Sequence, residues 1–434
     1  MKRYSEYKDS GVKWIGEIPG HWKTIRLRFL GNAQNGISKN GEYFGSGFPF
    51  ITYGDVYNSS TLQNASGLAL SSKEDQNLYS VKKGDIFFTR TSETIDEIGF
   101  SSVCLNTIPN GTFSGFLIRF RPNSNDLGTK YSSYYFRCRI HRNYFAKNMN
   151  IVIRASLGQT LLKNLPVIIP PLPEQEAIVT YLDSKVAKID EYIAIAEKKI
   201  AALEELKQTI IAEAVTRGIH KDVPMKDSGV KWIGMIPEHW NMLRAKNIFE
   251  RQFRPVRDCD EVVTCFRDGQ VTLRKNRRIE GFTESLKEIG YQGIRKGDLV
   301  IHQMDAFAGS IGVSDSDGKG TPVYICCLPK DYKNINVYFY AYLLREMARS
   351  GFIKSLYRGI RERSSDFRFD TFSVQWLPLV PIKEQNEIVT YIEEKVANIN
   401  QLCQAERSQI EKLKEYKQRL ISDVVTGKVK VTND

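Results

Sequence analysis

The sequence predicts an α/β (α+β) protein. Two mixed α/β domains are separated by a long antiparallel two-helix coiled coil, and the whole is a pseudo-two-fold internal repeat. Three observations predict this architecture. Two phrases recur far apart in the chain, the blocks between them differ, and each half ends in a long heptad run without glycine or proline. A length of 434 residues also exceeds one ordinary hydrophobic core.

The first repeated phrase lies near the start of each half. Lys8–Gly16 returns as Lys226–Gly234, and both copies continue through Ile-Pro-x-His-Trp. We call residues 8–30 and 226–248 the head segments. Each contains two closely spaced tryptophans, which usually anchor packing. We therefore interpret the head tryptophans as hydrophobic anchors rather than as DNA contacts: Trp14, Trp22, Trp232 and Trp240.

Between the head segments and the helices lie two variable blocks, residues 31–172 and 249–380. Short apolar runs bounded by Gly, Asn and Ser predict strands in the first block. The phrase at 83–88 has an echo at 296–301, and a helix predicted over 131–145 has an echo at 337–349. The two blocks are therefore expected to share one mixed fold while their loops diverge.

The second repeated phrase begins at Glu174-Gln175 and again at Glu384-Gln385. A helix of about 40 residues is predicted after each copy. At a rise of 1.5 Å per residue, each helix would be roughly 60 Å long. Apolar residues recur along both helices in steps of four and three, which is typical of a coiled-coil seam. A lysine replaces the apolar residue once in each helix, at Lys207 and Lys417. The predicted seam residues are Val186, Ile189, Ile193, Ile200, Leu203, Ile210, Val396, Ile399, Cys403, Ile410, Leu413 and Leu420.

A seam of this length cannot stay exposed, so the simplest arrangement pairs the two helices with each other. An antiparallel pairing avoids the long return connection that a parallel one needs. The repeat also places the chain's two termini close together, since the end of the second helix corresponds to the junction before the second head segment. The expected domains are a first globular domain over 1–172, a first helix over 173–217, a second globular domain over 218–382 and a second helix over 383–427.

The amino-acid composition indicates which kinds of binding partner suit this chain. The formal net charge of +12 and the pI of about 9.2 favour an acidic partner, with nucleic acid before an anionic membrane. The seven cysteines form no C-x-x-C pair and are expected to be reduced thiols. The chain starts without a signal peptide, and no stretch approaches the roughly 18 apolar residues of a membrane span. We therefore expect a cytoplasmic protein without a membrane partner.

The ordered double set of motifs resembles the DNA-specificity subunit of type I restriction-modification systems. The matching residues are the Trp-Ile-Gly-x-Ile-Pro-x-His-Trp head segments, Pro171–Ile178 with its second copy Pro381–Ile388, and the stretch Gly359–Asp366. The resemblance covers nearly the whole chain. One departure is Ile382-Lys383 in place of the usual Leu-Pro, which is expected to shift the start of the second helix slightly.

The resemblance implies a division of labour. Each variable block would be a target-recognition domain for one half of a split, asymmetric double-stranded DNA sequence. The helices would act as a ruler and dock two methyltransferase (modification) subunits. Restriction/translocase subunits would join the complex. S-adenosylmethionine, ATP and magnesium would be held by those partner subunits and not by this chain.

The sequence offers no recognisable catalytic or metal site of its own. The Gly312–Gly320 stretch is one residue too long for a phosphate-binding loop and has Gly320 where Ser or Thr must hold magnesium. The H-E-x-x-H and G-x-S-x-G motifs do not occur. The chain is therefore predicted to be a non-catalytic binding protein.

DNA contacts are expected in loops that differ between the blocks and carry groove-reading donors. In the first block the candidates are Lys39, Asn40, Arg90, Thr91, Ser92, Arg154, Ser156 and Gln159. In the second block they are Arg274, Lys275, Arg277, Arg278, Gln303, Arg358, Arg361, Arg363 and Ser364. For any single residue, a solvated surface charge is an equally good interpretation.

Two other functions remain open at this point. One is a non-catalytic coiled-coil scaffold protein with two ligand-binding domains, which explains the helices but not the basic loops. The other is an autonomous nuclease, which the lack of a recognisable metal-binding carboxylate cluster in the sequence disfavours. A double DNA footprint would separate the first from the leading hypothesis, and magnesium-dependent DNA hydrolysis by the purified chain would support the second.

Overall fold

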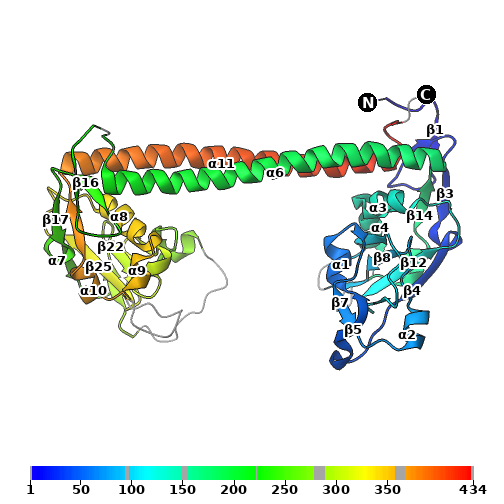
Figure 1. The fold of residues 1–434 in the computed structure, drawn as a ribbon, viewed down its shortest axis with the longest axis horizontal. Helices are drawn as coiled ribbons and strands as arrows, with labels where there is room; N and C mark the ends of the chain where they lie inside the picture. The colour runs from blue at the N-terminus through cyan, green and yellow to red at the C-terminus, as the bar shows by residue number, and fades with distance from the viewer. Residues whose placement is uncertain are drawn as a thin grey trace. The chain divides into compact units, whose positions relative to one another are not determined.

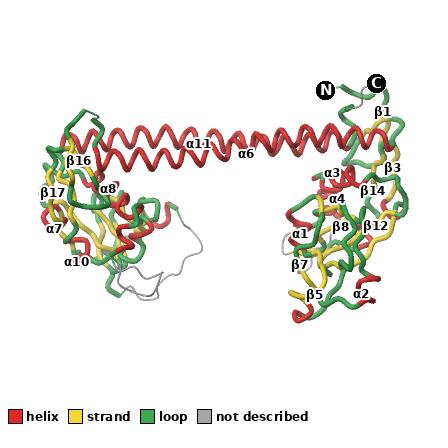
Figure 2. Tube along the Cα trace, in the orientation of Figure 1, coloured by secondary structure: helices red, strands yellow, loops and turns green. Residues whose placement is uncertain are grey.

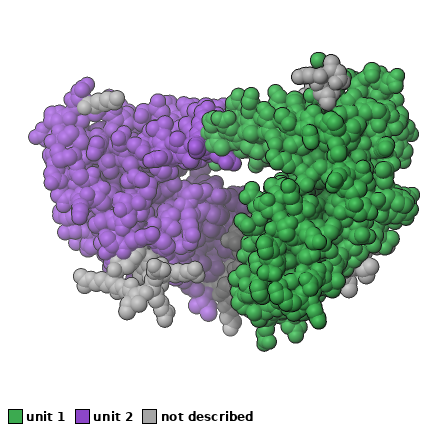
Figure 3. Space-filling view, turned by 45° about the vertical axis from the view of Figure 1, so that its right-hand side comes forward, with its two compact units in different colours: residues 1–196, 407–434 green, residues 197–406 purple. Residues whose placement is uncertain are grey.

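The structure is a computed structural model that describes residues 2–92, 97–148, 155–220, 222–277, 289–356 and 367–431. The chain forms two compact units (Figure 3). Unit 1 contains Met1–Ala196 and Arg407–Asp434, and unit 2 contains Glu197–Glu406. Each long helix is thus divided near its middle, so each unit holds one variable block, one head segment and half of the helix pair.

Unit 1 is built on a five-stranded mixed sheet in the order β4-β12-β8-β10-β6 (Figure 1). Its strands are β4 (Gly31–Asn35), β12 (Leu117–Pro122), β8 (Ile86–Thr89), β10 (Ser101–Cys104) and β6 (Thr61–Leu62). A smaller sheet joins β11 (Thr112–Phe113), β5 (Phe44–Ile51) and β7 (Gly67–Ala69). Three two-stranded pairs complete the unit: β1 (Tyr7–Asp9) with β2 (Glu17–Pro19), β3 (Lys23–Arg26) with β14 (Pro166–Ile169), and β9 (Thr91–Ser92) with β13 (Ala155–Ser156).

Unit 2 is built on a four-stranded antiparallel sheet in the order β18-β25-β22-β23. Its strands are β18 (Phe249–Gln252), β25 (Tyr324–Pro329), β22 (Leu299–His302) and β23 (Ile311–Val313). Four two-stranded pairs surround it: β15 (Met225–Asp227) with β16 (Met235–Pro237), β17 (Asn241–Arg244) with β26 (Trp376–Leu379), β19 (Val263–Cys265) with β20 (Val271–Leu273), and β21 (Gln292–Ile294) with β24 (Gly318–Gly320).

Short helices cover these sheets (Figure 2). In unit 1 they are α1 (Tyr53–Asn58), α2 (Lys73–Leu78), α3 (Thr129–Arg137), α4 (Arg139–Asn148), α5 (Gln159–Lys163), η1 (Leu27–Phe29) and η2 (Gly41–Tyr43). In unit 2 they are α7 (Ala245–Ile248), α8 (Val337–Arg349), α9 (Phe352–Ser355), α10 (Phe369–Ser373), η4 (Arg274–Asn276) and η5 (Ala306–Ala308). The helix predicted over 131–145 is interrupted, because Cys138 has extended backbone angles between α3 and α4.

The two long helices are α6 (Leu172–Arg217) and α11 (Ile382–Val425). They begin at equivalent positions of the repeat, so the expected shift at Ile382-Lys383 is wrong. The first N–H groups of a helix have no intrahelical partner, and proline or lysine in the first turn therefore costs the helix no hydrogen bond. Both helices end next to a left-handed glycine, Gly218 or Gly427, a conformation that other residues rarely adopt.

Contacts within each unit establish the antiparallel pairing of α6 and α11 (Figure 1). In unit 1, Lys417 Nζ donates to both oxygens of Asp190, at 2.7 and 2.8 Å. In unit 2, Lys199 pairs with Glu406, and Lys207 Nζ donates to Asn400 at 3.3 Å. Partner numbers fall along α11 as they rise along α6, which confirms the predicted fold class.

The predicted seam residues are all at least partly withdrawn from solvent. Ile189, Ile399, Cys403, Ile410 and Leu420 are buried, and the other predicted positions are partly buried: Val186, Ile193, Ile200, Leu203, Ile210, Val396 and Leu413. The lysines that interrupt the pattern reach across to a polar residue of the opposite helix, Asp190 or Asn400. These pairs lie at the exposed border of the seam, and they favour one register because a slip would separate each lysine from its partner on the opposite helix.

Each head segment closes over the junction of the two helices through a tryptophan and a glutamate. Trp22 and Trp240 are fully buried. The Trp22 indole N–H donates to Glu174 at 3.0 Å, and the Trp240 indole N–H donates to Glu384 at 3.1 Å. The preceding histidine, His21 or His239, pairs with the same carboxylate. We call this arrangement the head clasp. The negative charge also lies in the first helical turn, where the helix dipole favours it.

The glutamine that follows each clasp glutamate joins the helix to its variable block. The Gln175 side chain accepts from the Gly128 N–H at 2.8 Å and donates to the carbonyls of Pro170 and Asp126. Gln385 accepts from the Asn336 N–H at 2.7 Å and donates to the carbonyls of Val380 and Asn334. Both glutamines are buried with these three hydrogen bonds. The repeated Glu-Gln phrase therefore joins head segment, long helix and variable block at one point.

The repeated Lys-Gly-Asp phrase has a structural role as well. Asp85 and Asp298 are buried, and each accepts a backbone N–H from the turn that precedes its strand. Each also receives two hydrogen bonds from one arginine, Arg121 onto Asp85 and Arg254 onto Asp298. Arg121 and Arg254 are thus structural, and because each is balanced by its own aspartate, these pairs contribute nothing to the net charge of +12.

An arginine occurs at equivalent positions of α3 and α8, but its hydrogen-bond partners differ between the two units. Arg137 donates to the carbonyls of Val56, Tyr57, Ser59 and Ser101. Arg345 occupies the equivalent position on α8, packs against Gly269, and makes no hydrogen bond or ion pair with any residue that the structure describes. Burial lowers the pKa of Arg137 to about 10, and it also lowers the pKa of Arg345.

The chain's termini meet inside unit 1. The Lys430 N–H donates to the Lys2 carbonyl at 3.0 Å, and the Tyr7 hydroxyl donates to the Gly427 carbonyl at 3.1 Å. The proximity that the repeat predicts is therefore present. Within the described part of the chain, no helix combines the length and apolarity that crossing a membrane requires.

Removing the carboxylate of a head clasp should destabilise its unit. Glu384→Ala leaves the buried Trp240 N–H without an acceptor, which costs about 1–3 kcal/mol of unfolding free energy. Calorimetric unfolding of the full chain measures the loss. Glu394→Ala, at an exposed position on the same helix, is the matched control and should change stability by less than about 0.5 kcal/mol. Equal losses in the two variants would contradict the clasp.

Arg137 and Arg345 should respond differently to the same substitution. Arg137→Met removes the donor to four carbonyls and is expected to cost about 2–4 kcal/mol of unfolding free energy. Arg345→Met removes a desolvated charge that makes no hydrogen bond or ion pair within the described part of the chain, so stability should be unchanged or slightly higher. Chemical denaturation of both variants tests this, and a larger loss for Arg345→Met would refute the assignment.

Candidate nucleic-acid interface

Several of the polar residues singled out from the sequence meet at one edge of the main sheet in unit 1. Strand β12 runs antiparallel to both β4 and β8. The carboxyl ends of β4 and β8 therefore lie beside the amino end of β12. Three loops leave the sheet at this edge: the one after β4, the one after β8, and the 115–116 turn before β12. The Gly115 N–H donates to the Ile37 carbonyl at 2.7 Å, which ties two of these loops together.

Arg90 is fixed at this edge by three hydrogen bonds. Its N–H donates to the Phe116 carbonyl at 2.9 Å, and its carbonyl accepts from the Leu157 N–H at 2.8 Å. Its guanidinium Nη1 donates to the Gly115 carbonyl at 3.4 Å. The backbone of Arg90 is thus hydrogen-bonded through both its N–H and its carbonyl, and its guanidinium is oriented by the uncharged carbonyl of Gly115.

The loop that precedes α5 joins Arg90 through the β9–β13 pair. Ser92 pairs with Ala155 and Thr91 with Ser156, and the Thr91 and Ser156 hydroxyls lie 3.5 Å apart. Gln159 begins α5 directly afterwards. Two candidate clusters far apart in sequence are therefore one surface: Arg90, Thr91, Ser92, Ser156 and Gln159. Arg154 lies outside the described residues.

Lys39 and Asn40 follow β4 and are exposed, but Lys39 is already paired. Its ammonium group lies 2.9 Å from Asp75 and 4.5 Å from the centre of the Tyr43 ring. Burial alone would raise the pKa of Asp75, but hydrogen bonds from Lys39, Ser72 and Tyr43 outweigh it and lower this pKa to about 2. The charge of Lys39 is thus compensated within the protein, which weakens it as a phosphate contact.

Unit 2 has the same edge with a different side chain. Gln303 follows β22 as Arg90 follows β8. The Gln303 N–H donates to the Val323 carbonyl at 2.9 Å, and its carbonyl accepts from the Phe367 N–H at 3.1 Å. The side-chain amide donates to the Pro322 carbonyl at 3.3 Å. These three bonds match those of Arg90 one for one.

The basic cluster after β20 is held by acidic neighbours. Lys275 pairs with Glu261, and Arg277 pairs with Asp268 while its guanidinium lies over the Phe266 ring. Arg274 Nε is 3.5 Å from the Thr264 hydroxyl. The rest of the second candidate set lies outside the described residues: Arg278, Arg358, Arg361, Arg363 and Ser364.

Two exposed apolar side chains at these edges were missed from the sequence. Phe116 is 56% exposed beside the carbonyl that holds Arg90, and Met304 is 44% exposed directly after Gln303. Apolar side chains at a groove edge can contact thymine methyl groups. The equivalence of Arg90 and Gln303 was also missed, although the aligned Lys-Gly-Asp phrases upstream carried the signal.

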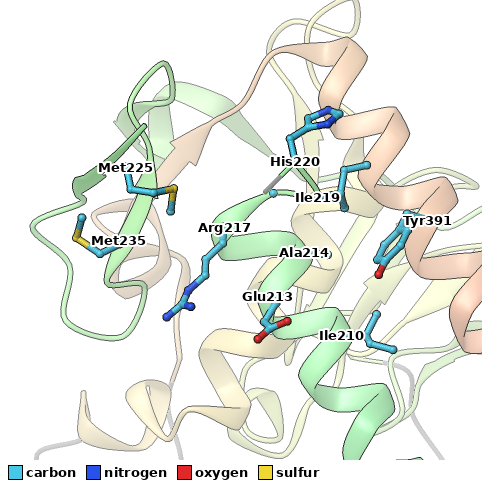
Figure 4. Close-up of a pocket in the computed structure, with 10 residues that line it drawn as sticks. Ile210, Glu213, Ala214, Arg217, Ile219, His220, Met225, Met235 and Tyr391 are labelled. Atoms are coloured by element: carbon cyan, nitrogen blue, oxygen red, sulfur yellow. The ribbon is translucent and has the colours of Figure 1, made fainter. Parts of the chain in front are cut away.

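A pocket of about 520 Å³ in unit 2 lies elsewhere, where the last turns of α6 meet the second head segment (Figure 4). Met225 and Met235 face it from the head strands, and Glu213 and Arg217 face it from α6. His220 at its rim pairs with Glu387 at 3.5 Å. Among the described residues no group of three or more His, Cys, Asp or Glu side chains is placed to hold a metal ion.

Known proteins share this sequence pattern. Residues 19–205 match the type I restriction modification DNA specificity domain. The chain is 24% identical to the type I restriction enzyme MjaX specificity subunit of Methanocaldococcus jannaschii, with 98% of each chain covered. It is 23% identical to the type I restriction enzyme EcoBI specificity subunit of Escherichia coli, where the match covers 65% of this chain and 62% of that one.

Solved structures share the fold. One comes from work on complex assembly and conformational transition of the type I R-M system, with a TM-score of 0.67 at 14% identity over 94% of this chain and 98% of that one. The HsdS subunit from Thermoanaerobacter tengcongensis gives a TM-score of 0.54 at 15% identity, covering 95% and 98%. The resemblance inferred from the repeated motifs is confirmed: residues 19–205 match the type I restriction modification DNA specificity domain, and the curated relatives are specificity subunits of type I restriction enzymes.

Proposed function

We propose that each unit reads one half of a bipartite, asymmetric double-stranded DNA target. Helices α6 and α11 set the spacing of the two halves and dock two methyltransferase subunits. The observation that carries this proposal is the pair of matched strand edges. The same backbone arrangement presents arginine in unit 1 and glutamine in unit 2. A conserved frame with unlike polar side chains suits two different half-sites.

The net positive charge of the chain supports duplex binding in a second way. The chain carries an excess of Lys and Arg, and several of them are paired to carboxylates. Phosphate contacts fix the register of a protein on DNA without carrying sequence information. We therefore assign sequence reading to the strand edges, and backbone contact to exposed cations elsewhere on the two blocks.

In this proposal the chain is non-catalytic. Restriction/translocase subunits complete the complex, and S-adenosylmethionine, ATP and magnesium are bound by the partner subunits. The complex acts in the cytoplasm, where its DNA substrate is found. Support comes from the relatives, which are named as specificity subunits of type I restriction enzymes, and from the similar chain whose structure concerns the assembly of such a system.

The alternative of a coiled-coil scaffold with two ligand-binding domains is not favoured. It accounts for α6 and α11 but gives no reason for two matched strand edges with different donors. The relatives are named as specificity subunits of type I restriction enzymes and not as scaffold proteins.

Exchanging one variable block should change one half-site only. Residues 249–380 are replaced by the corresponding block of a relative, and duplexes bound by the assembled complex are selected from a random pool. The first half-site should persist and the second should change, because each block carries its own readers. Raising the salt concentration serves as the control and should weaken both halves alike. Simultaneous loss of both half-sites in a folded chimaera would count against the proposal.

A further inference from the structure

We infer that Arg90 and Gln303 are equivalent base-reading positions, Arg90 for a guanine in the half-site of unit 1 and Gln303 for an adenine in the half-site of unit 2. This inference rests on the proposed function and names which residue sets one base in each half. The two positions are structurally equivalent, their side chains are oriented alike, and their chemistry differs in the way the two bases differ.

The equivalence is set by backbone contacts. Each residue directly follows a buried four-residue strand, β8 or β22, that begins after a Lys-Gly-Asp turn. Its N–H donates to the residue before the neighbouring strand, Phe116 or Val323. Its carbonyl accepts from the residue that leads toward the next short helix, Leu157 or Phe367. The surrounding loops differ in length and sequence, so these matched bonds define one position that recurs in two contexts.

The side chains are oriented by matched acceptors. Arg90 Nη1 and Gln303 Nε2 donate to the carbonyls of Gly115 and Pro322, which precede Phe116 and Val323 in the same way. A backbone carbonyl offers no charge that would neutralise arginine, unlike the carboxylates that hold Lys39, Lys275 and Arg277. A side chain that is already oriented by a hydrogen bond loses less conformational entropy when it contacts a ligand.

The chemistry of the two side chains differs in one respect that matters in the major groove. A guanidinium has five N–H donors, and two of them match the N7 and O6 acceptors of guanine. A glutamine amide has a donor and an acceptor, which match N7 and N6–H of adenine. Both pairings leave an N–H for the anchoring carbonyl. The same backbone position therefore selects guanine when it carries arginine and adenine when it carries glutamine.

The test exchanges the two side chains. The full chain, assembled with its modification subunits, is prepared as wild type, Arg90→Gln, Gln303→Arg and Arg90→Lys, and bound duplexes are selected from a random pool. Arg90→Gln should change one guanine of the first half-site to adenine and leave the second half-site intact. Gln303→Arg should change one adenine of the second half-site to guanine. Affinity for the original base should fall by about 5- to 150-fold.

Arg90→Lys keeps donors that suit guanine and should retain the guanine preference with weaker binding. Lys39→Gln is the matched control on the same edge and should keep the wild-type motif, because its charge is already compensated by Asp75. Melting temperatures within a few degrees of wild type establish that the variants are folded.

The outcomes separate this inference from the proposed function. A bipartite motif in the wild type that survives unchanged in both exchange variants overturns the base assignment alone. Loss of both half-sites in a folded Arg90→Gln variant overturns it as well, because a base reader in unit 1 cannot set the second half-site. A wild-type complex that selects no motif would remove the proposed function, and the inference with it.

Discussion

The fold depends on a polar joint that occurs twice. At the start of each long helix a glutamate accepts from a buried tryptophan, and the glutamine after it holds three backbone groups of the variable block. Leaving any of these groups unpaired in the interior would cost more than the hydrogen bond contributes. The joint therefore fixes head segment, helix and block together, and it does so with residues outside the divergent loops. The loops are free to vary because the orientation of the block does not depend on them.

The antiparallel helix pair adds a second constraint. Its apolar seam drives association, and the lysines within it are matched to polar partners, Asp190 in unit 1 and Asn400 in unit 2. A change of register would separate each lysine from its polar partner on the opposite helix, and it would also misalign the apolar seam. Each unit contains one copy of the polar joint and half of the helix pair. The two variable blocks are therefore attached to the long helices in the same way.

The sequence was sufficient for everything that the repeat governs. It predicted the mixed fold, the long helices, their antiparallel pairing and the meeting of the termini, because periodic and duplicated patterns report on packing directly. It did not reveal that Cys138 breaks the predicted helix, or that the Tyr135 hydroxyl is buried and accepts from the Ile168 N–H. Those features depend on contacts between residues far apart in the chain.

The candidate interface was predicted only in part, for the same reason. Arg90 and Ser156 were chosen separately from loop composition, and only strand pairing shows that they share a surface. Lys39 and Lys275 were chosen for their charge, which local composition reveals, whereas their carboxylate partners come from distant segments. The match between Arg90 and Gln303 follows from the aligned Lys-Gly-Asp phrases, but the backbone hydrogen bonds that establish it come only from the structure.

The central claim is that two unlike readers on duplicated frames recognise one DNA target in two parts. Base-resolution sequencing of modified adenines in cells that carry this chain with its modification subunits tests the claim most directly. The account predicts a single motif of two specified, unrelated parts separated by a gap of constant length. A continuous motif, a palindrome of identical halves, or a gap that varies from site to site would contradict it.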